Sequence, residues 1–510
     1  FTNTRKISPG QWYQYFKQRI KIPRIEEVKV PLPVTQRIPN WFKQLKTFVT
    51  RDLLSKLANK QYMVINLSLS PVLALFMAFF TKYYDATGPE NKGYVFFENE
   101  NIPVYFFMSV VVALFVGLIV SAEEIFRDRK IRKREAFLHL SNSSYLFSKL
   151  VILFGLSAIQ TFTFLVLGNL ILEIPLTEIR YWLILFSCSC FANVLGLNIS
   201  SAFDSAVTIY ILIPVLVIPQ LLMSGVVIPF DKFNPKVGDP VTIPVMGELM
   251  ASRWAYEAFM VTQFKDNPYE KIFYGLDQEE QAAEGKHMWW YSHMETELSN
   301  LIRWKSHWRD QNHEGVTKAL EIVRSELKYE TESIDRPRPE LMARLEVGKF
   351  DSTTFLETRQ LLRRFAEMYR KIDSTAEARK EALRLKLTST PENSARLDEM
   401  KWRYTNRAIK DLVEARLVIH KVVPYGGRLH LKYKPIYFDD HRPSNFLDFR
   451  ANFYVPTKHF MGQKFDTLYF NVSAIWFMTI ILFITLYFDL LKKGVQALET
   501  RRKYRRKNIT

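Results

Sequence analysis

The segment that decides the fold is Pro103-Val-Tyr-Phe-Phe-Met-Ser-Val-Val-Val-Ala-Leu-Phe-Val-Gly-Leu-Ile-Val-Ser121, which is closely followed by Arg127-Asp-Arg-Lys-Ile-Arg-Lys-Arg134. An apolar run of this length can cross the ~30 Å hydrocarbon core of a bilayer as a helix. A dense basic run beside such a helix marks a loop that stays in the cytoplasm. The pair therefore predicts a membrane protein and the orientation of this helix.

Five further apolar segments have comparable length. Together with the first, they predict six transmembrane helices at 62–83, 103–121, 146–172, 181–199, 206–230 and 468–490. Basic residues gather before the first span, after the second and after the sixth, whereas the loops 85–102 and 173–180 contain few. Basic loops stay inside, so we expect both termini in the cytoplasm.

The formal net charge of +18 could indicate nucleic-acid binding, because clustered Lys and Arg are also the footprint of phosphate recognition. Much of this charge lies beside the apolar segments, where topology and anionic lipid headgroups would place it. We therefore expect membrane lipid as a partner and no nucleic acid.

The remainder of the chain divides by sequence pattern. Residues 1–37 mix aromatic and basic residues with prolines, which is typical of an extended cytoplasmic connector. Residues 38–60 repeat apolar residues at helical spacing among lysines and arginines, which predicts an amphipathic connecting helix in the headgroup region. Residues 61–230 hold the first five spans, 466–492 the sixth, and 493–510 a basic cytoplasmic tail.

Residues 265–465 form a hydrophilic insertion, which the predicted topology places outside the cytoplasm. Apolar residues keep helical spacing in 316–327, 361–372 and 397–419, which predicts a helical hairpin or small bundle. Residues 429–437 alternate with period two and predict one or two strands. The expected fold class is an all-α polytopic membrane domain with six transmembrane helices and a large, mainly helical extracytoplasmic insertion containing minor β structure.

No catalytic constellation is evident. The chain has no G-x-x-x-x-G-K-[ST], H-E-x-x-H or G-x-S-x-G motif. Its two cysteines, Cys188 and Cys190, lie within the predicted fourth span, where packing is a commoner role than metal binding. The spacing of His287 and His293 does not place both on one helix face. We expect no catalytic residue and no metal site.

Polar residues inside the spans can hydrogen-bond between helices or line a translocation path, and both interpretations stay open. These residues are Gln160, Thr161, Asn169, Asn193 and Asn198. Glu123 and Glu124 end the second span, where carboxylates could serve a proton relay. The many basic groups nearby favour ion pairs instead.

The order of these features resembles the membrane half of ABC exporters of the G-subfamily type, also called type V. The shared order is an amphipathic connecting helix, two spans, a basic helix, three spans, an outer loop and a sixth span. The local sequences that agree are Glu124-Ile-Phe-Arg-Asp-Arg-Lys-Ile-Arg-Lys-Arg-Glu-Ala-Phe137 with Ser144, Tyr145 and Lys149, then Ser224-Gly-Val-Val227, and Ala251-Ser-Arg-Trp-Ala-Tyr-Glu-Ala-Phe259. The resemblance covers about residues 38–260 and 465–492 and leaves out the insertion.

The resemblance implies a coupling helix at about 127–139 that docks on a nucleotide-binding domain. Its contact residues would be Arg127, Arg132, Arg134, Glu135 and Phe137. We expect Arg134 and Glu135 to carry this contact, since charge pairs fix the register between two rigid bodies.

The resemblance also implies an apolar valve, a central cavity and a re-entrant segment at 231–264. Val226 and Val227 would form the valve, where better-known members carry leucines. Candidate cavity residues are Phe106, Phe107, Val110, Gln160, Ile218, Leu222 and Met223.

The implied function is the permease portion of an ATP-driven exporter that moves a hydrophobic or amphipathic substrate by alternating access, as a homodimer. ATP and Mg would be bound by a nucleotide-binding domain that these residues do not contain. A chain that starts at Phe1 suggests a domain fused upstream, and a separate subunit is the other possibility. The cysteine-free insertion, with no glycosylation sequon at a clearly external position, favours a bacterial inner membrane.

An alternative function belongs to another class: a non-transporting membrane anchor or mechanotransmitter that recruits or moves a periplasmic partner through its insertion. The size of the insertion motivates it. An ion channel is disfavoured, because no span carries a repeated charged or carbonyl-rich filter pattern.

Overall fold

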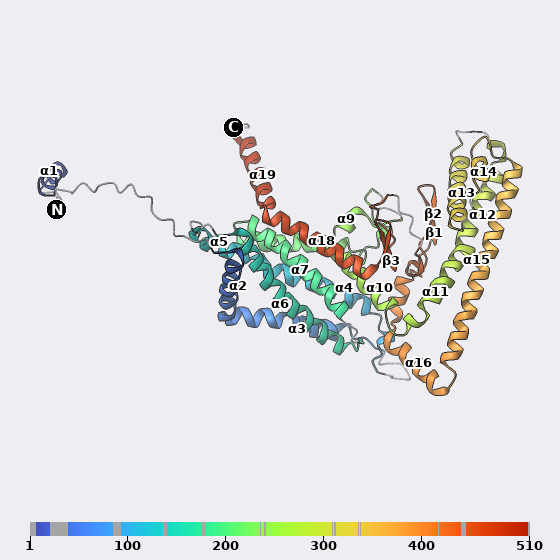
Figure 1. Ribbon diagram of the computed structural model, residues 1–510, viewed down its shortest axis with the longest axis horizontal. Helices are drawn as coiled ribbons and strands as arrows, with labels where there is room; N and C mark the ends of the chain where they lie inside the picture. The colour runs from blue at the N-terminus through green and yellow to red at the C-terminus, as the bar shows by residue number, and fades with distance from the viewer. Residues whose placement is uncertain are drawn as a thin grey trace.

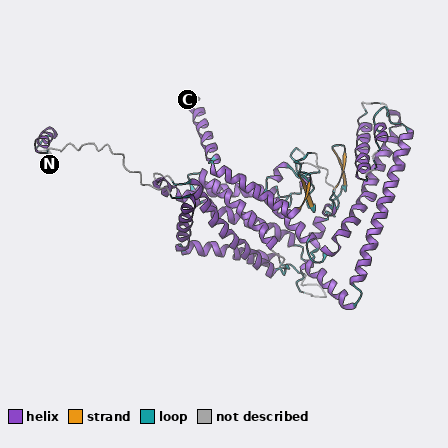
Figure 2. Cartoon of the chain, in the orientation of Figure 1, coloured by secondary structure: helices purple, strands orange, loops and turns teal. Residues whose placement is uncertain are grey.

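The structure is a computed structural model that describes residues 7–20, 39–84, 93–135, 138, 140–175, 179–234, 236–238, 241–308, 310, 313–334, 336, 338–416, 418–439 and 445–507. Helices dominate, and the described strands form two short hairpins (Figure 2). The helices make up a membrane region and an insertion, which lies beyond one end of the membrane helices (Figure 1). The predicted fold class is confirmed as a helical membrane domain with a mainly helical insertion and minor β structure.

The membrane region is built from apolar helices that follow the predicted spans. They are α3 (Lys60–Thr81), α4 (Ile102–Ala122), α6 (Asn142–Ile171), α7 (Ile179–Ala202), α8 (Ala206–Leu222) and α18 (Thr467–Tyr487). Within the described residues, five helices are long and apolar enough to cross a membrane, and α8 is the shorter apolar helix beside them. Six spans are therefore an approximate count.

Helix α8 corrects the predicted span 206–230, because it ends at Leu222 after 17 residues. At ~1.5 Å per residue it is about 25 Å long, which is less than the ~30 Å hydrocarbon core. Beyond it the chain turns at Gly225, whose φ is +80°. Glycine adopts this conformation readily, and a Cβ there would lie 2.4 Å from the Phe230 ring. The tight turn therefore ends the helix early.

Further helices flank the membrane bundle. They are α1 (Pro9–Arg19), α2 (Trp41–Ala58), α5 (Glu124–Glu135), α10 (Ala251–Lys265) and α19 (Leu490–Lys507), with the short elements η1 (Phe96–Glu98), η3 (Phe230–Lys232) and α9 (Val245–Glu248). The sequence predicted neither α1 nor α19. Helix α1 lies within the expected extended connector and starts at a capping box between Ser8 and Gln11. Helix α19 lies in the basic tail and follows Asp489, whose φ of 50° separates it from α18.

Helices α4 and α7 pack closely against each other, and glycine permits their approach. A Cβ on Gly117 of α4 would lie 2.8 Å from both the Ala192 Cβ and the Ser189 backbone oxygen of α7. Small residues at a helix crossing let two backbones come close, which is how membrane helices gain van der Waals contact.

We expect Gly117→Ala to destabilise the protein by about 1–3 kcal/mol, since the added methyl group forces α4 and α7 apart. Thermal unfolding in nanodiscs measures this change. Gly155→Ala in α6 is the matched control, because a Cβ there meets no atom within 4 Å. An equal effect of the two substitutions would contradict the close packing.

The insertion contains a helical bundle with its own apolar core. Its helices are α11 (Glu270–Glu284), the π-helix η4 (Gly285–Trp290), α12 (Tyr291–Arg303), α13 (Glu314–Ser333), α14 (Pro339–Arg344) and α15 (Ser352–Leu387), with the short η5 (Lys305–His307). Residues such as Trp290, Met294, Val323 and Leu362 are fully buried in this core. The helices predicted around 316–327 and 361–372 are confirmed as α13 and α15.

The helix expected over 397–419 is divided into α16 (Pro391–Tyr404) and α17 (Arg407–Val413). Thr405 has an extended backbone, and the Asn406 side chain caps α17 by accepting from the Ile409 N–H. The same side chain donates to the backbone oxygens of Phe96 (2.7 Å) and Asn99 (2.9 Å). Asn406 thus both breaks the helix and joins the insertion to the segment before α4.

The strands form two antiparallel hairpins, β1 (Val422–Tyr425) with β2 (Arg428–Leu431), and β3 (Thr457–Phe460) with β4 (Gln463–Asp466). The first overlaps the predicted strand region, which ends in the short helix η6 (Pro435–Tyr437). The sequence did not predict the second hairpin, which leads directly into α18.

Candidate functional site

Helix α5, which contains the predicted coupling residues, is fixed to the end of α7 by reciprocal capping. The Ser200 Oγ accepts hydrogen bonds from the backbone N–H groups of Ile125 (3.0 Å) and Phe126 (2.9 Å) in the first turn of α5. The Arg129 guanidinium in turn donates to the backbone oxygens of Ser200 (3.3 Å) and Ser201 (2.7 Å) in the last turn of α7. Backbone groups at helix ends lack hydrogen-bond partners within their own helix, and here a side chain of each helix provides partners for the end of the other helix.

A buried lysine ties α5 to two further helices. Lys149 of α6 is 2% exposed, and its Nζ lies 3.0 Å from Asp52 of α2, 3.0 Å from Glu124 and 2.8 Å from Asp128. Lys56 of α2 also pairs with Glu124. A charge out of water needs close partners, and this lysine has three carboxylates around it. The ion-pair interpretation of Glu124 is confirmed.

The predicted coupling residues divide between the surface and this network. Arg127 and Arg134 are exposed on α5. Glu135, expected at an outside contact, pairs with Arg51 of α2 at 2.7 Å. Glu135 therefore forms a partly exposed ion pair with α2 in the described structure, and Arg127 and Arg134 are the exposed cations of the predicted set.

The remaining predicted coupling residues are Arg132 and Phe137, and neither is described as exposed. Arg132 is partly buried, donates to the Asn142 Oδ1 at 2.8 Å and lies 4.5 Å from the centre of the Tyr145 ring. Phe137 lies outside the described residues. The contact of α5 with a partner domain stays a prediction.

Sequence reasoning missed Arg129 and Ser200. Their contact joins residues 71 positions apart, and nothing within the basic run distinguishes Arg129 from its neighbours. A serine near the end of a predicted span beside a basic helix was the available signal, and it is weak.

The polar residues of the membrane helices make hydrogen bonds between helices. Asn193 of α7 donates to the Ser157 Oγ of α6 at 2.7 Å, and Gln160 of α6 donates to the Asn66 oxygen of α3 at 2.8 Å. Asn198 of α7 donates to the Leu482 oxygen of α18 at 2.9 Å. Of the two interpretations that the sequence left open, these bonds support packing for Gln160, Asn193 and Asn198.

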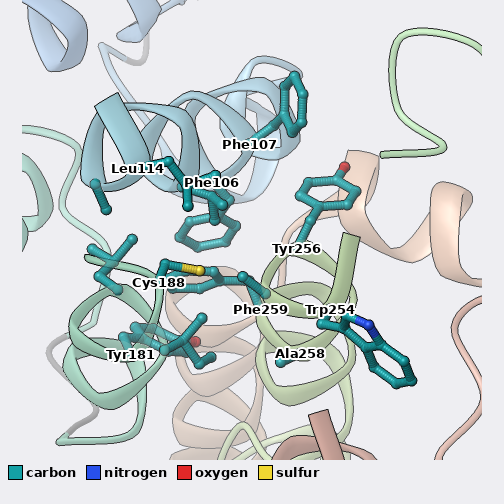
Figure 3. Packing of buried hydrophobic residues seen from close by; sticks show 14 of the residues in the cluster. Phe106, Phe107, Leu114, Tyr181, Cys188, Trp254, Tyr256, Ala258 and Phe259 are labelled. Atoms are coloured by element: carbon teal, nitrogen blue, oxygen red, sulfur yellow. The ribbon is translucent and has the colours of Figure 1, made fainter. Parts of the chain in front are cut away.

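The cavity candidates on α4 lie in the packed core of the subunit. Phe106, Phe107 and Val110 are 1%, 4% and 0% exposed. The Phe106 ring stacks on Phe259 of α10 at 5.1 Å, and Phe107 meets Tyr256 of α10 at 5.7 Å (Figure 3). In this conformation protein surrounds all three side chains, so they do not border an open path.

The candidates near the end of α8 are more exposed than those on α4. Ile218 and Leu222 are exposed, and so is the predicted valve residue Val227. Met223 and the other valve residue, Val226, are half-buried. The structure therefore buries the α4 candidates and leaves Ile218, Leu222 and Val227 on the surface of the chain, and the cavity and the valve stay predictions.

A second charged cluster joins the membrane helices to the insertion, and we call it the α10 junction. The Glu257 carboxylate of α10 lies 3.0 Å from the Lys458 Nζ of β3 and accepts from the Asn471 Nδ2 of α18 at 2.9 Å. It also accepts from the Tyr454 N–H at 3.2 Å, and Arg253 lies 3.5 Å away.

Burial dominates the electrostatics of the α10 junction. Arg253, Glu257, Lys458 and Asn471 are each 0% exposed. Burial lowers the pKa of Lys458 below its ordinary value, although the Glu257 carboxylate acts in the opposite direction. The sequence gave no sign of this cluster, because Lys458 follows Glu257 by 201 residues.

Comparison with known proteins bears on the membrane region. Residues 43–264, which extend from α2 to α10, match the family model of the ABC-2 type transporter. A search of curated proteins gave no match. Permease domains of this family act together with nucleotide-binding ATPase components. The apolar helices and the family match establish a multi-pass membrane protein, and residues 43–264 of this chain form an ABC-2 type transporter domain, the membrane permease component of ABC transporters.

Proposed function

We propose that the chain is the permease portion of an ATP-driven exporter that moves a hydrophobic or amphipathic substrate by alternating access. The observation that carries this proposal is the attachment of α5. Reciprocal caps fix it to α7, and the Lys149 network fixes it to α2 and α6. A displacement of α5 by a docked ATPase would then move several membrane helices together, as switching between packed states requires. ATP and Mg would be bound by that ATPase domain, whether fused or separate.

The working unit in this proposal is a homodimer. One face of α8 carries exposed apolar side chains at helical spacing, namely Val207, Ile211, Val215, Ile218 and Leu222. A second copy of the chain packed near this face would place Ile218, Leu222 and Val227 beside a central path. Lipid contact is the other use of such a face.

The proposed location is a bacterial inner membrane with both termini in the cytoplasm. The charge pattern supports it, since α2, α5 and α19 are rich in Lys and Arg and lie towards one end of the membrane bundle (Figure 1). The insertion is then extracytoplasmic.

Charge reversal on α5 tests the coupling role. We expect Arg127→Glu with Arg134→Glu to lower ATP-driven transport about tenfold or more in the assembly with its ATPase, because steering and register at a docking surface depend on charge. Thermal stability should stay near that of the parent, since both side chains are exposed. Lys328→Glu on the exposed surface of α13 is the control. Unchanged transport and assembly would show that α5 is not the docking helix.

The α10 junction favours a second candidate, the anchor or mechanotransmitter that acts on a periplasmic partner. It joins the insertion to α10 and α18 through buried charges, a connection that could transmit movement. Deleting 270–447 discriminates between the two functions, because Tyr454 and Lys458 remain in place. Transport that survives the deletion supports an exporter with an accessory domain. If the parent protein shows no transport and the deletion abolishes binding of the periplasmic partner, the result supports the mechanotransmitter.

A further inference from the structure

Helix α1 has an aromatic face that the described structure leaves uncovered. With 3.6 residues per turn, Trp12, Tyr13, Phe16 and the cap residue Ile20 gather on one side of the helix. These side chains are 62%, 64%, 47% and 52% exposed. All residues from 10 to 20 are exposed. An apolar face of this kind on a short helix needs a partner to be stable in water.

The charges of α1 indicate which partner fits. Lys17 and Arg19 flank the two edges of the aromatic face, and the helix contains no acidic residue. The opposite side carries Gln11, Gln14 and Gln18, with the exposed Tyr15 beside them, and none of these side chains is charged. Aromatic rings prefer the level of the lipid headgroups, and flanking Lys and Arg can extend their charges to the phosphates. A helix with this division typically lies in the plane of an anionic lipid surface.

We propose that α1 is an interfacial anchor that lies with its aromatic face in the headgroup region of an anionic membrane. A bilayer is always close to α1, because the same chain contains helices that are long and apolar enough to cross one. The 20 residues between Ile20 and Trp41 can reach at most ~70 Å, so α1 has access to the bilayer surface next to α2. The proposal concerns the attachment of the connector and does not depend on transport.

The competing partner is a protein surface such as the ATPase domain. The observations favour lipid, because both edges of the face are cationic and the helix has no acidic residue, so its charge is complementary to anionic headgroups. Anionic lipid attracts each Lys or Arg near its surface, so this preference can be measured through lipid charge.

A labelling experiment on the full chain in nanodiscs tests the proposal. The native Cys188 and Cys190 are buried in α7, so a new surface cysteine can be labelled selectively. Phe16→Cys places an environment-sensitive fluorophore on the aromatic face, and Gln18→Cys places it on the opposite side. Brominated lipid in phosphatidylcholine and phosphatidylglycerol nanodiscs serves as the quencher. We expect quenching at position 16 to exceed that at position 18 at least threefold, by the geometry of an interfacial helix.

Lipid charge provides the second arm of the test. Nanodiscs of phosphatidylcholine alone, or the substitutions Lys17→Glu with Arg19→Glu, should lower the equilibrium constant for association of α1 with the lipid about tenfold or more. Lys371→Glu on the exposed face of α15 is the control and should change nothing. Equal quenching at both positions would overturn the proposal. So would a fluorophore at position 16 that is shielded from water yet insensitive to brominated lipid, since a protein then covers the face. Quenching that ignores lipid charge would overturn the assignment to an anionic surface.

Discussion

Lys149→Met is expected to lower the free energy of unfolding of the membrane domain by about 3–5 kcal/mol, the range for breaking a buried ion pair by removing one partner. Lys149 is 2% exposed, and Asp52, Glu124 and Asp128 all lie within 3.0 Å of its Nζ. Methionine fills a similar volume but leaves these carboxylates without that partner. Thermal unfolding in nanodiscs, with binding of the ATPase component as a second readout, measures the effect.

The matched control for Lys149 is Lys318→Met in α13. Its pair with Glu314 is exposed at both ends, so the change should stay within about 1 kcal/mol. Combining Lys149→Met with Asp128→Asn should recover part of the loss, because the Asp128 charge then no longer faces the position that Lys149 occupied. If Lys149→Met were no more damaging than Lys318→Met, the network would not fix α5 to α2 and α6.

The second large effect is expected at the α10 junction, where Glu257→Gln should also cost about 3–5 kcal/mol. The Glu257 carboxylate pairs with Lys458 and accepts from the Asn471 side chain and the Tyr454 N–H. The neutral amide leaves the Lys458 and Arg253 charges buried without that carboxylate. Thermal unfolding measures the loss, and limited proteolysis around 445–456 reports whether the junction opens.

A double-mutant cycle separates the interaction between Glu257 and Lys458 from the other effects of each substitution on stability. Glu257→Gln with Lys458→Met removes both charges, so its cost should fall below the sum of the two single costs by about 1–3 kcal/mol. Lys464→Met on β4 is the control, since its pair with Asp439 is exposed. Strictly additive costs would show that Glu257 and Lys458 do not act as a pair.

Helices with a local apolar pattern were predictable from the sequence, whereas elements fixed by distant contacts were not. Helices α13 and α15 were predictable because their apolar residues repeat at helical spacing within a single element. The end of α8 was not, since apolar residues continue past Leu222 and the turn at Gly225 depends on packing against Phe230. The β3–β4 hairpin was missed because the buried position of β3 is a lysine, Lys458, whose charge is paired with Glu257 of a distant helix.

The candidate site shows the same division. The basic segment of α5 was evident as charge, and Glu124 was correctly expected to form ion pairs. Glu135 pairs with Arg51 in the described structure, and its contact with a partner domain stays a prediction. The sequence did not show which cations of α5 face outward, because contacts of α5 with α2 and α7 determine which of its side chains are covered.

By itself, the sequence determined that this is a multi-pass, mainly helical membrane protein with a basic helix after its second span. Hydrophobic length and periodicity are local properties, and bilayer thickness converts them directly into structure. Only the tertiary structure decided that α5 and α7 cap each other, that Lys149 joins three helices, and that Glu257 binds the insertion to the membrane domain. Those contacts join residues far apart in the chain. A buried charge is stable only where packing supplies its partner, so no local pattern could reveal them.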